Sequence, residues 1–131
     1  METSPVSSLK EEGVRLLKAG KISEAIEKLQ QALALDPEDG QIHCYLGAAY
    51  NAMPDKLHAI HHFEECVRLE ESPKAYYNLG LVYESVHRVD EAVRQYRMAL
   101  ELDPNYTKAR EALEKLHERF EEQKKKQSTT T

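Results

Sequence analysis

The sequence predicts an all-α fold built from repeated helical hairpins, and three observations lead to that prediction. The same residue types return along the 131-residue chain at a nearly constant interval of about 34 residues. Within each interval, apolar residues recur at i, i+3, i+4 and i+7, which is typical of one face of an α-helix. Five Gly and five Pro leave little room for the turns of an all-β fold, and strong helix formers dominate the composition.

Four sets of residues share the repeat, and each set has one member in every copy. The sets are Gly13, Gly47 and Gly80; Ala25, Ala59 and Ala92; Leu29, Phe63 and Tyr96; and Ala32, Cys66 and Ala99. Within every set the second interval is shorter than the first by one position, and Pro37 and Pro104 are separated by the sum of the two intervals. Four markers with one common shift indicate three copies of one structural unit.

The first and third copies end in similar turns, which contain Asp36-Pro37 and Asp103-Pro104. The second copy ends through residues 69–73, a turn that is one residue shorter and lacks the Asp-Pro pair. We therefore expect the chain to enter the third copy through a differently built turn.

The third copy shows the two helices of the unit most clearly. The stripe of its first helix is Tyr76, Leu79, Gly80 and Tyr83, and that of its second helix is Ala92, Tyr96, Ala99 and Leu100. Residues 85–89 form a short polar turn, and Asp90 is the expected N-cap of the second helix. Because glycine inside a helix costs about 1 kcal/mol relative to alanine, the recurring glycine indicates a close approach of the two helices.

A further helix is expected after the third copy. Its apolar stripe is Ala109, Ala112, Leu113, Leu116 and Phe120, with charged residues between. A terminal repeat would otherwise expose its last apolar face, and a helix with a polar back covers such a face. Residues 107–123 are therefore predicted to be a capping helix.

The period and the markers resemble the tetratricopeptide repeat (TPR), whose signature is W-x2-L-G-x2-Y, then A-x3-F, then P. The third copy has every marker, with Tyr76 in the Trp place and Tyr96 in the Phe place. The first copy has Glu12 in place of Leu, and the second has His43 in the Trp place and lacks the Pro. The resemblance implies a right-handed superhelical solenoid of three helix-turn-helix repeats with a capping helix.

This interpretation divides the chain into six segments. They are a disordered N-terminus at 1–5, TPR repeats at 6–39, 40–72 and 73–106, a capping helix at 107–123, and a disordered polar tail at 124–131.

The charge and composition argue against several classes of protein. A net charge of -5 with interspersed signs lacks the basic face that nucleic acid requires, so no nucleic-acid partner is expected. No apolar stretch approaches the roughly 18 residues of a membrane span, and the N-terminus does not resemble a signal peptide. We therefore expect no membrane partner and a cytoplasmic location, where Cys44 and Cys66 would be free thiols.

The segment HAIHHFEEC, residues 58–66, raises the question of a metal site. His58 and His62 are four residues apart and could bind one ion, but His58 and Cys66 lie about 12 Å apart along a helix. Because zinc sites normally need three or four ligands, we expect no metal site and interpret His58, His61 and His62 as a solvated helix face. His43, at a core position, is expected to be a buried, hydrogen-bonded histidine.

No catalytic residue is predicted, because the sequence contains no phosphate-binding loop and none of the common hydrolase or zinc-protease motifs. The protein is therefore not expected to be an enzyme, and no cofactor is expected.

The resemblance implies that the first helix of each repeat lines a concave groove. The groove candidates are Lys10, Val14, Leu17, Tyr45, Ala48, Asn51, Lys74, Tyr77, Asn78, Leu81 and Lys108, and Cys44 lies in the same row. Tyrosines and amides among aliphatic residues suit a peptide ligand. The alternative is that Val14, Leu17, Ala48 and Leu81 belong partly to the core between repeats.

One branch of the resembled family clamps the acidic C-terminal tails of heat-shock chaperones with Lys, Asn and Arg residues. Lys10 and Lys74 match that set, whereas Val14, Tyr45 and Asn78 replace the expected Asn, Asn and Arg. An acidic chaperone tail is therefore not the expected ligand.

The sequence thus predicts an adaptor or scaffold that binds a peptide or helix of a partner protein and works as a monomer. One alternative is a self-assembling structural protein, in which the Ala112, Leu116 and Phe120 side of the capping helix pairs with a second copy. A weaker alternative is a metal-responsive protein that uses His58 and His62.

Overall fold

The computed structural model describes residues 4–129, and this part of the chain is an all-α solenoid of seven helices without strands. The predicted fold class is confirmed. The helices are α1 (Pro5–Lys18), α2 (Ile22–Leu35), α3 (Gly40–Ala52), α4 (Lys56–Leu69), α5 (Pro73–Ser85), α6 (Val89–Leu102) and α7 (Thr107–Thr129).

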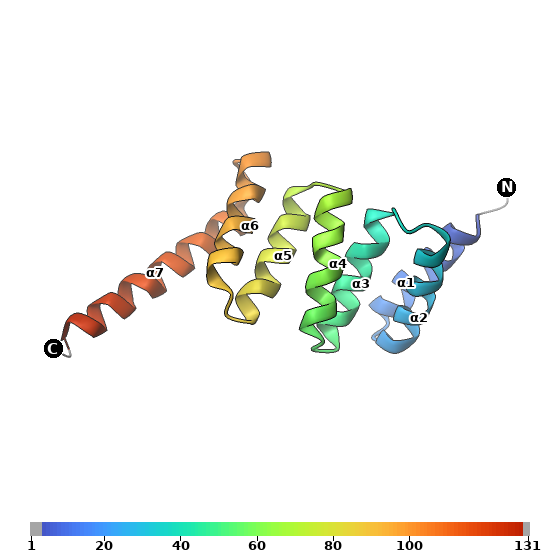
Figure 1. The fold of residues 1–131 in the computed structure, drawn as a ribbon, viewed down its shortest axis with the longest axis horizontal. Coiled ribbons are helices and arrows are strands. Elements are labelled where there is room, and N and C mark those ends of the chain that lie inside the picture. The colour runs from blue at the N-terminus through green and yellow to red at the C-terminus, as the bar shows by residue number, and fades with distance from the viewer. Residues whose placement is uncertain (1–3, 130–131) are drawn as a thin grey trace.

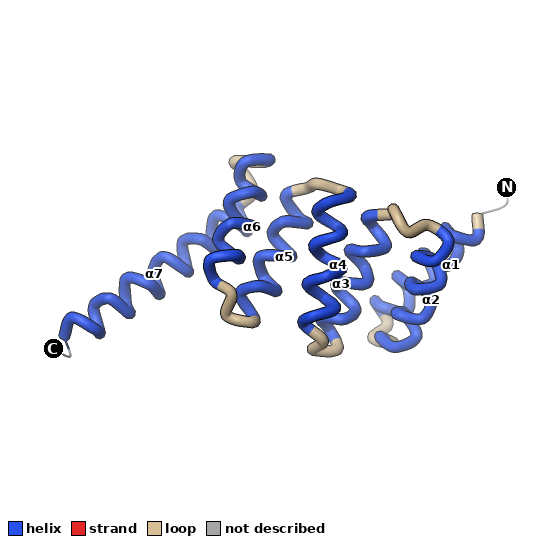
Figure 2. Tube along the Cα trace, viewed as in Figure 1, coloured by secondary structure: helices blue, strands red, loops and turns tan. Residues whose placement is uncertain are grey.

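The helices follow one another in chain order along the long axis of the molecule, and the termini lie at opposite ends (Figure 1). The hairpins α1–α2, α3–α4 and α5–α6 are the tightest packed pairs, and each second helix also packs against the first helix of the next hairpin. Only short loops join the helices (Figure 2). Among the described residues, each unit therefore packs mainly against its neighbours, as in other solenoids.

The recurring glycines permit close packing within each hairpin. A Cβ atom would lie 2.7 Å from Leu29 at Gly13, 2.8 Å from Phe63 at Gly47 and 2.5 Å from Tyr96 at Gly80. This confirms the close approach that the sequence predicted.

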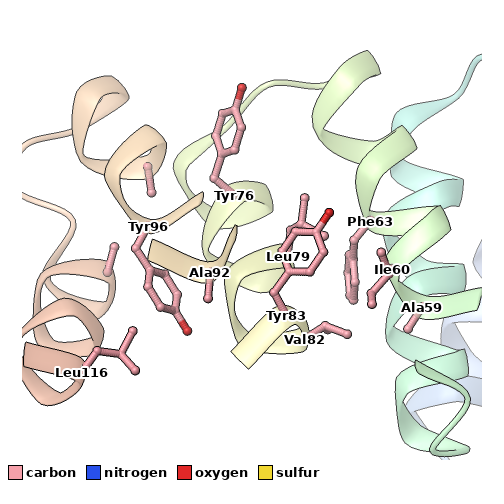
Figure 3. Close-up of a cluster of buried hydrophobic side chains, with 12 residues drawn as sticks. Ala59, Ile60, Phe63, Tyr76, Leu79, Val82, Tyr83, Ala92, Tyr96 and Leu116 are labelled. Atoms are coloured by element: carbon pink, nitrogen blue, oxygen red, sulfur yellow. The ribbon is translucent and has the colours of Figure 1, made fainter. Parts of the chain in front are cut away.

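The main core runs from α4 to α7 (Figure 3). Tyr96 and Ala92 of α6 are fully buried, and Leu79 of α5 is almost so. Ala109 and Leu116 of α7 are buried against the same cluster, so α7 covers the apolar face of α6. Glu114, which takes the place on α7 that Gly80 holds in the preceding repeat, is exposed.

The helix starts differ in how they are capped. The side chain of Ser72 accepts a hydrogen bond from the Ala75 amide, and Pro73 begins α5, which explains how the third hairpin starts without an Asp-Pro turn. The predicted Asp90 cap is wrong, because Arg88 is the N-cap of α6 and makes no side-chain capping bond. Asp90 lies in the first turn instead, where a carboxylate favourably meets the helix dipole.

The three turns inside the hairpins share one backbone feature. Gly20, Pro54 and His87 have positive φ angles of 81°, 29° and 65°. Their spacing along the chain equals that of the glycines Gly13, Gly47 and Gly80, so the same place in each repeat adopts this conformation.

Both predicted disordered ends need correction within the described residues. Ser4 caps α1, which begins at Pro5, while residues 1–3 lie outside the described part. The tail predicted at 124–131 is helical to Thr129, and residues 130–131 are not described. The Glu, Gln and Lys residues of this segment are good helix formers, and no Gly or Pro interrupts them.

Candidate functional site

Two hollows lie side by side along the row formed by the first helices of the hairpins and α7. The larger, about 510 Å³, lies between α5 and α7. It is lined by Tyr77, Leu81, Glu84, Lys108, Glu111, Ala112, Lys115, Glu118 and Arg119. Three of the predicted groove residues, Tyr77, Leu81 and Lys108, are thereby brought together.

The apolar floor of this hollow includes Tyr77 and Leu81. The ring of Tyr77 packs against the rings of Tyr96 and Tyr106, with centroids 5.9 Å and 5.8 Å apart. Leu81 is 42% exposed, so its side chain is accessible to a ligand. The hollow therefore presents the Tyr77 ring, which is fixed by its two neighbouring rings, beside the exposed side chain of Leu81.

A network of three helices includes two residues that line this hollow, Glu84 and Arg119. The Tyr96 hydroxyl on α6 donates a 2.8 Å hydrogen bond to Glu84 on α5, and Arg119 on α7 forms a 2.7 Å ion pair with Glu84. Burial, together with the neighbouring carboxylate, raises the pKa of Tyr96 well above its usual value. Tyr96 therefore stays neutral and remains the donor in this bond.

The smaller hollow, about 200 Å³, lies between α3 and α5. Its lining residues are Gln41, Cys44, Tyr45, Glu70, Ser72, Lys74, Ala75 and Asn78. Three further predicted residues, Tyr45, Lys74 and Asn78, meet here. Its polar side chains carry amide, hydroxyl, carboxylate and ammonium groups, whereas the polar side chains of the larger hollow are mostly charged.

Lys10 of α1 is engaged within the protein instead. Its Nζ atom lies 2.7 Å from Asp39 Oδ2 and donates to Gln41 Oε1 at 2.9 Å. Partial burial of Asp39 would raise the pKa of its carboxyl, but Lys10 and the backbone amides of α3 hold this pKa below its usual value. Lys10 thus joins α1 to the start of α3 and is not a free cation.

The remaining predicted residues, Val14, Leu17, Ala48 and Asn51, line neither hollow. The Asn51 side chain accepts a hydrogen bond from Lys56. The sequence prediction missed Lys115, Glu118 and Arg119. They continue the spacing of three or four residues that begins at Lys108, and this spacing could have identified them.

The prediction of two free thiols is wrong. Cys44 of α3 and Cys66 of α4 form a disulfide, with their Cα atoms 5.2 Å apart. These positions face each other across the α3–α4 hairpin, although Cys44 lies off the apolar stripe of its own helix.

The prediction of a solvated histidine face is wrong for His62, which is 5% exposed, whereas His58 and His61 are exposed. His62 turns toward α3, where its Nδ1 atom lies 3.1 Å from Nδ1 of His43. His43 is 6% exposed, and its Nε2 atom lies 3.1 Å from the Pro37 carbonyl oxygen. The buried, hydrogen-bonded His43 that the sequence predicted is therefore confirmed.

The hydrogen bonds fix the protons of this pair. A carbonyl only accepts, so Nε2 of His43 carries a proton and donates to Pro37. In a neutral ring Nδ1 of His43 is then the acceptor, and Nδ1 of His62 is the donor. Burial, with added repulsion from His43, His61 and His58, lowers the pKa of His62 to about 4.

The histidines do not form a metal centre within the described residues, where no group of three or more His, Cys, Asp or Glu side chains is placed to hold an ion. The Tyr50 ring stacks on His58 and on His62, with centroids 4.8 Å and 5.5 Å apart. These stacks use the ring faces for packing between α3 and α4.

None of the helices in the described part of the chain is long and apolar enough to span a membrane.

Two models of one protein family match the chain and together cover more than half of it. The model described as "TPR repeat" matches residues 13–53, and the model described as "Tetratricopeptide repeat" matches residues 73–106.

Curated relatives match most of the chain at modest identity. The Hsp70-Hsp90 organising protein of Plasmodium falciparum is 27% identical over 109 residues, which are 82% of this chain and 43% of the relative. Superkiller complex protein 3 of Homo sapiens is 31% identical over 106 residues, which are 80% of this chain and 7% of the relative. The chain spans less than half the length of these relatives.

Solved structures share the whole architecture. The first TPR of Spaghetti (RPAP3), bound to the HSP90 peptide SRMEEVD, matches with a TM-score of 0.83 and 27% identity, over 92% of this chain and 96% of that one. The Sgt2 TPR domain from Aspergillus fumigatus also has a TM-score of 0.83, with 25% identity over 94% of this chain and 83% of that one.

Proposed function

Because this chain belongs to the tetratricopeptide-repeat family, we propose that it is a protein-interaction module that holds a peptide or helix of a partner in the groove along α3, α5 and α7. The module acts as an adaptor or scaffold and performs no catalysis of its own.

The observation that carries this proposal is the pair of adjoining hollows, between α3 and α5 and between α5 and α7. Tyr45, Lys74 and Asn78 line one of them, and Tyr77, Leu81 and Lys108 line the other. Apolar side chains for contact area, with nearby amide and ammonium groups for orientation, are what a peptide site requires. The RPAP3 domain, which has a similar fold, binds a peptide.

The groove favours a ligand that differs from an acidic tail. Lys10 is neutralised by Asp39, and Lys108 and Lys115 alternate along α7 with Glu111 and Glu118. This balance of charge gives no net attraction for a run of carboxylates. We propose that the ligand places an apolar side chain over Tyr77 and Leu81 and that its backbone meets Asn78.

A peptide-display selection against the full chain tests the proposal. The groove variant is Lys74→Ala/Leu81→Ala, because both side chains are exposed and their loss should not unfold the protein. The control is Leu57→Ala/Lys125→Ala, which removes one exposed leucine and one exposed lysine outside both hollows.

We expect the parent and the control to enrich one common peptide motif, and the groove variant to bind those peptides at least about tenfold more weakly, a loss of about 1.4 kcal/mol. Enrichment of the same peptides by the groove variant would place the binding surface elsewhere.

Self-assembly through α7 is the competing explanation. Leu116 is buried against α6, and Phe120 is 55% exposed. The proposed adaptor keeps the mass of one chain over a broad concentration range in sedimentation experiments. A mass that rises with concentration and returns to the monomer value in Phe120→Glu would favour self-assembly.

The proposal also includes the cytoplasmic location expected from the sequence. Fluorescence microscopy of the tagged chain tests this part.

A further inference from the structure

We propose that the Cys44–Cys66 disulfide is a thiol-exchange site that opens into the groove, so that a thiol ligand becomes covalently attached at Cys44. This inference extends to chemistry that the binding proposal does not contain.

The two cysteines lie in different environments. Cys44 is half-buried and lines the hollow between α3 and α5, beside Tyr45 and Asn78. Cys66 is 0% exposed and belongs to the packed interior. A thiol that enters the hollow therefore reaches Cys44 and not Cys66.

The repeat pattern supports this asymmetry independently. Cys44 occupies the place that Lys10 and Tyr77 hold in the other repeats, and both are half-buried residues of the groove row. Cys66 occupies the place of Ala32 and Ala99, both of which are fully buried. One half of the disulfide thus belongs to the ligand surface and the other half to the core.

The exchange balances without an external oxidant. A ligand thiolate attacks Sγ of Cys44, a new S–S bond forms between the ligand and Cys44, and the Cys44–Cys66 bond breaks. The electron pair of the broken bond leaves on Sγ of Cys66, which then takes up one proton from solvent. A second thiolate that attacks the mixed disulfide releases the oxidised ligand and leaves Cys44 reduced.

The hollow can also assist the approach of an anion. Lys74 lies in the same hollow, and none of the ion pairs found among residues 4–129 involves it. Its ammonium group attracts a thiolate, while Glu70 at the same hollow partly offsets this attraction.

Two single variants test the asymmetry in the folded chain. Cys66→Ala leaves Cys44 as the only thiol and introduces the residue that the other two repeats have at this place. Cys44→Ala leaves only Cys66. Alkylation by iodoacetamide without denaturant should be at least about 100-fold faster for the first variant, because buried cysteines are inert.

Glutathione disulfide should form a stable mixed disulfide with Cys66→Ala and none with folded Cys44→Ala. Peptide mapping of the parent treated with reduced glutathione and quenched with acid should place the adduct on Cys44. Equal alkylation rates, or an adduct on Cys66, would overturn the proposal. Circular dichroism and alkylation in urea confirm that each variant folds and that its cysteine is intact.

Two further exchange reactions distinguish a small-molecule thiol from a peptide thiol as the ligand. Reduced glutathione represents small thiols, and a short acetylated peptide with cysteine flanked by leucines represents a protein ligand. A peptide rate about tenfold above the glutathione rate, lost in Lys74→Ala/Leu81→Ala, assigns the site to peptides, while equal rates assign it to small thiols. Glutathione exchange at Cys44 in a chain that selects no display peptide would support this inference and reject the binding proposal.

Discussion

Nδ1 of His43 and Nδ1 of His62 lie 3.1 Å apart inside the protein, so only one proton fits between them. A second proton would set two N–H groups against each other, next to His58 and His61 on α4 and Tyr50 on α3. Glu65 nearby favours the charged form of His62, but burial and the neighbouring histidines outweigh it and lower the pKa of His62. His62 therefore stays neutral in the folded protein at neutral pH.

This neutrality predicts that acid destabilises the fold. Because the pKa of His62 falls from 6.5 in the unfolded chain to about 4 in the folded one, the unfolded state binds more protons between these values. The contribution is fully present above pH 6.5 and is lost as the pH falls toward 4, by about 2–3 kcal/mol in total. Urea unfolding at several pH values between 7.5 and 4 measures this loss.

Carboxylates such as Asp39 titrate in part of the same range, so a control is needed. His62→Gln removes the titrating ring, and its free energy of unfolding should depend less steeply on pH than that of the parent. His61→Gln, at an exposed position on the same helix, should retain the parent's slope. Equal slopes in all three proteins would contradict the assignment.

The sequence predicted the burial of His43 and missed that of His62, for a physical reason. His43 stands on an apolar stripe, whereas His62 lies one position beside one and looks solvated in a single helix. The burial of His62 depends on how α3 packs against α4, and the apolar periodicity of a single helix does not encode this packing. A signal was nevertheless present, because a buried histidine needs a polar partner and the neighbouring helix carries three histidines.

Within the helical hairpins, the spacing between the two helices depends on glycine. At Gly80 the new Cβ of an alanine would lie 2.5 Å from the Tyr96 ring, which is fully buried and held by Glu84. Gly80→Ala should therefore lower the free energy of unfolding by about 2 kcal/mol, despite the better helix propensity of alanine. Urea unfolding measures the change.

Gly13→Ala provides the comparison, because the nearest atoms there belong to Leu29, which can change rotamer. We expect a smaller loss of stability at Gly13 than at Gly80. An equal loss would show that ring rigidity does not determine the effect.

A substitution in the turns between paired helices is expected to raise the free energy of unfolding, whereas the glycine substitutions lower it. His87 has a φ of 65°, a region that costs a side-chain-bearing residue about 1 kcal/mol, and Gly20 fills the same place in the first repeat. His87→Gly should stabilise the protein by about 0.5–1 kcal/mol, measured as an increased midpoint of urea unfolding.

His117→Gly is the matched control, because His117 is an exposed histidine inside α7. It should destabilise by up to about 1 kcal/mol, since glycine is a poor helix former. A loss of stability in both variants would mean that the turn tolerates His87 without cost.

Helix identity was predictable from the sequence, because apolar periodicity reports directly on a buried face. The ends were less predictable: Asp90 looked like a cap, yet α6 begins one residue earlier at Val89. The identity of the N-cap depends on one or two backbone angles, and several polar residues near a turn can act as the N-cap. The charged end of α7 was interpreted as disordered because composition alone does not separate a solvated helix from a coil.

At the scale of the whole molecule, α7 is required because nothing else among the described residues covers the outer face of α6. A chain that ends at residue 106 would expose the surface under Ala109 and Leu116 and would lose the Arg119–Glu84 ion pair. We expect this truncation to unfold at much lower urea concentration, or to aggregate. A chain that ends at residue 123 should keep the parent's stability within about 0.5 kcal/mol, because residues 124–128 are exposed.

Six of the eleven predicted groove residues line the two hollows, whereas Lys10, also predicted for the groove, is bound to Asp39. The resemblance implied which row of helices would face a ligand. The resemblance did not predict that ion pairs within the protein, such as Lys10–Asp39, would engage residues of this row. Such ion pairs depend on side-chain rotamers and on the neighbouring turns.

Glu114 has a consequence for how this molecule could lengthen. It occupies the place where a further hairpin would need glycine, so its side chain keeps a new partner helix from approaching α7. An additional repeat spliced between α6 and α7 would find ready interfaces on both sides. The same repeat appended behind α7 would meet the Glu114 side chain at the place where the three hairpins have glycine.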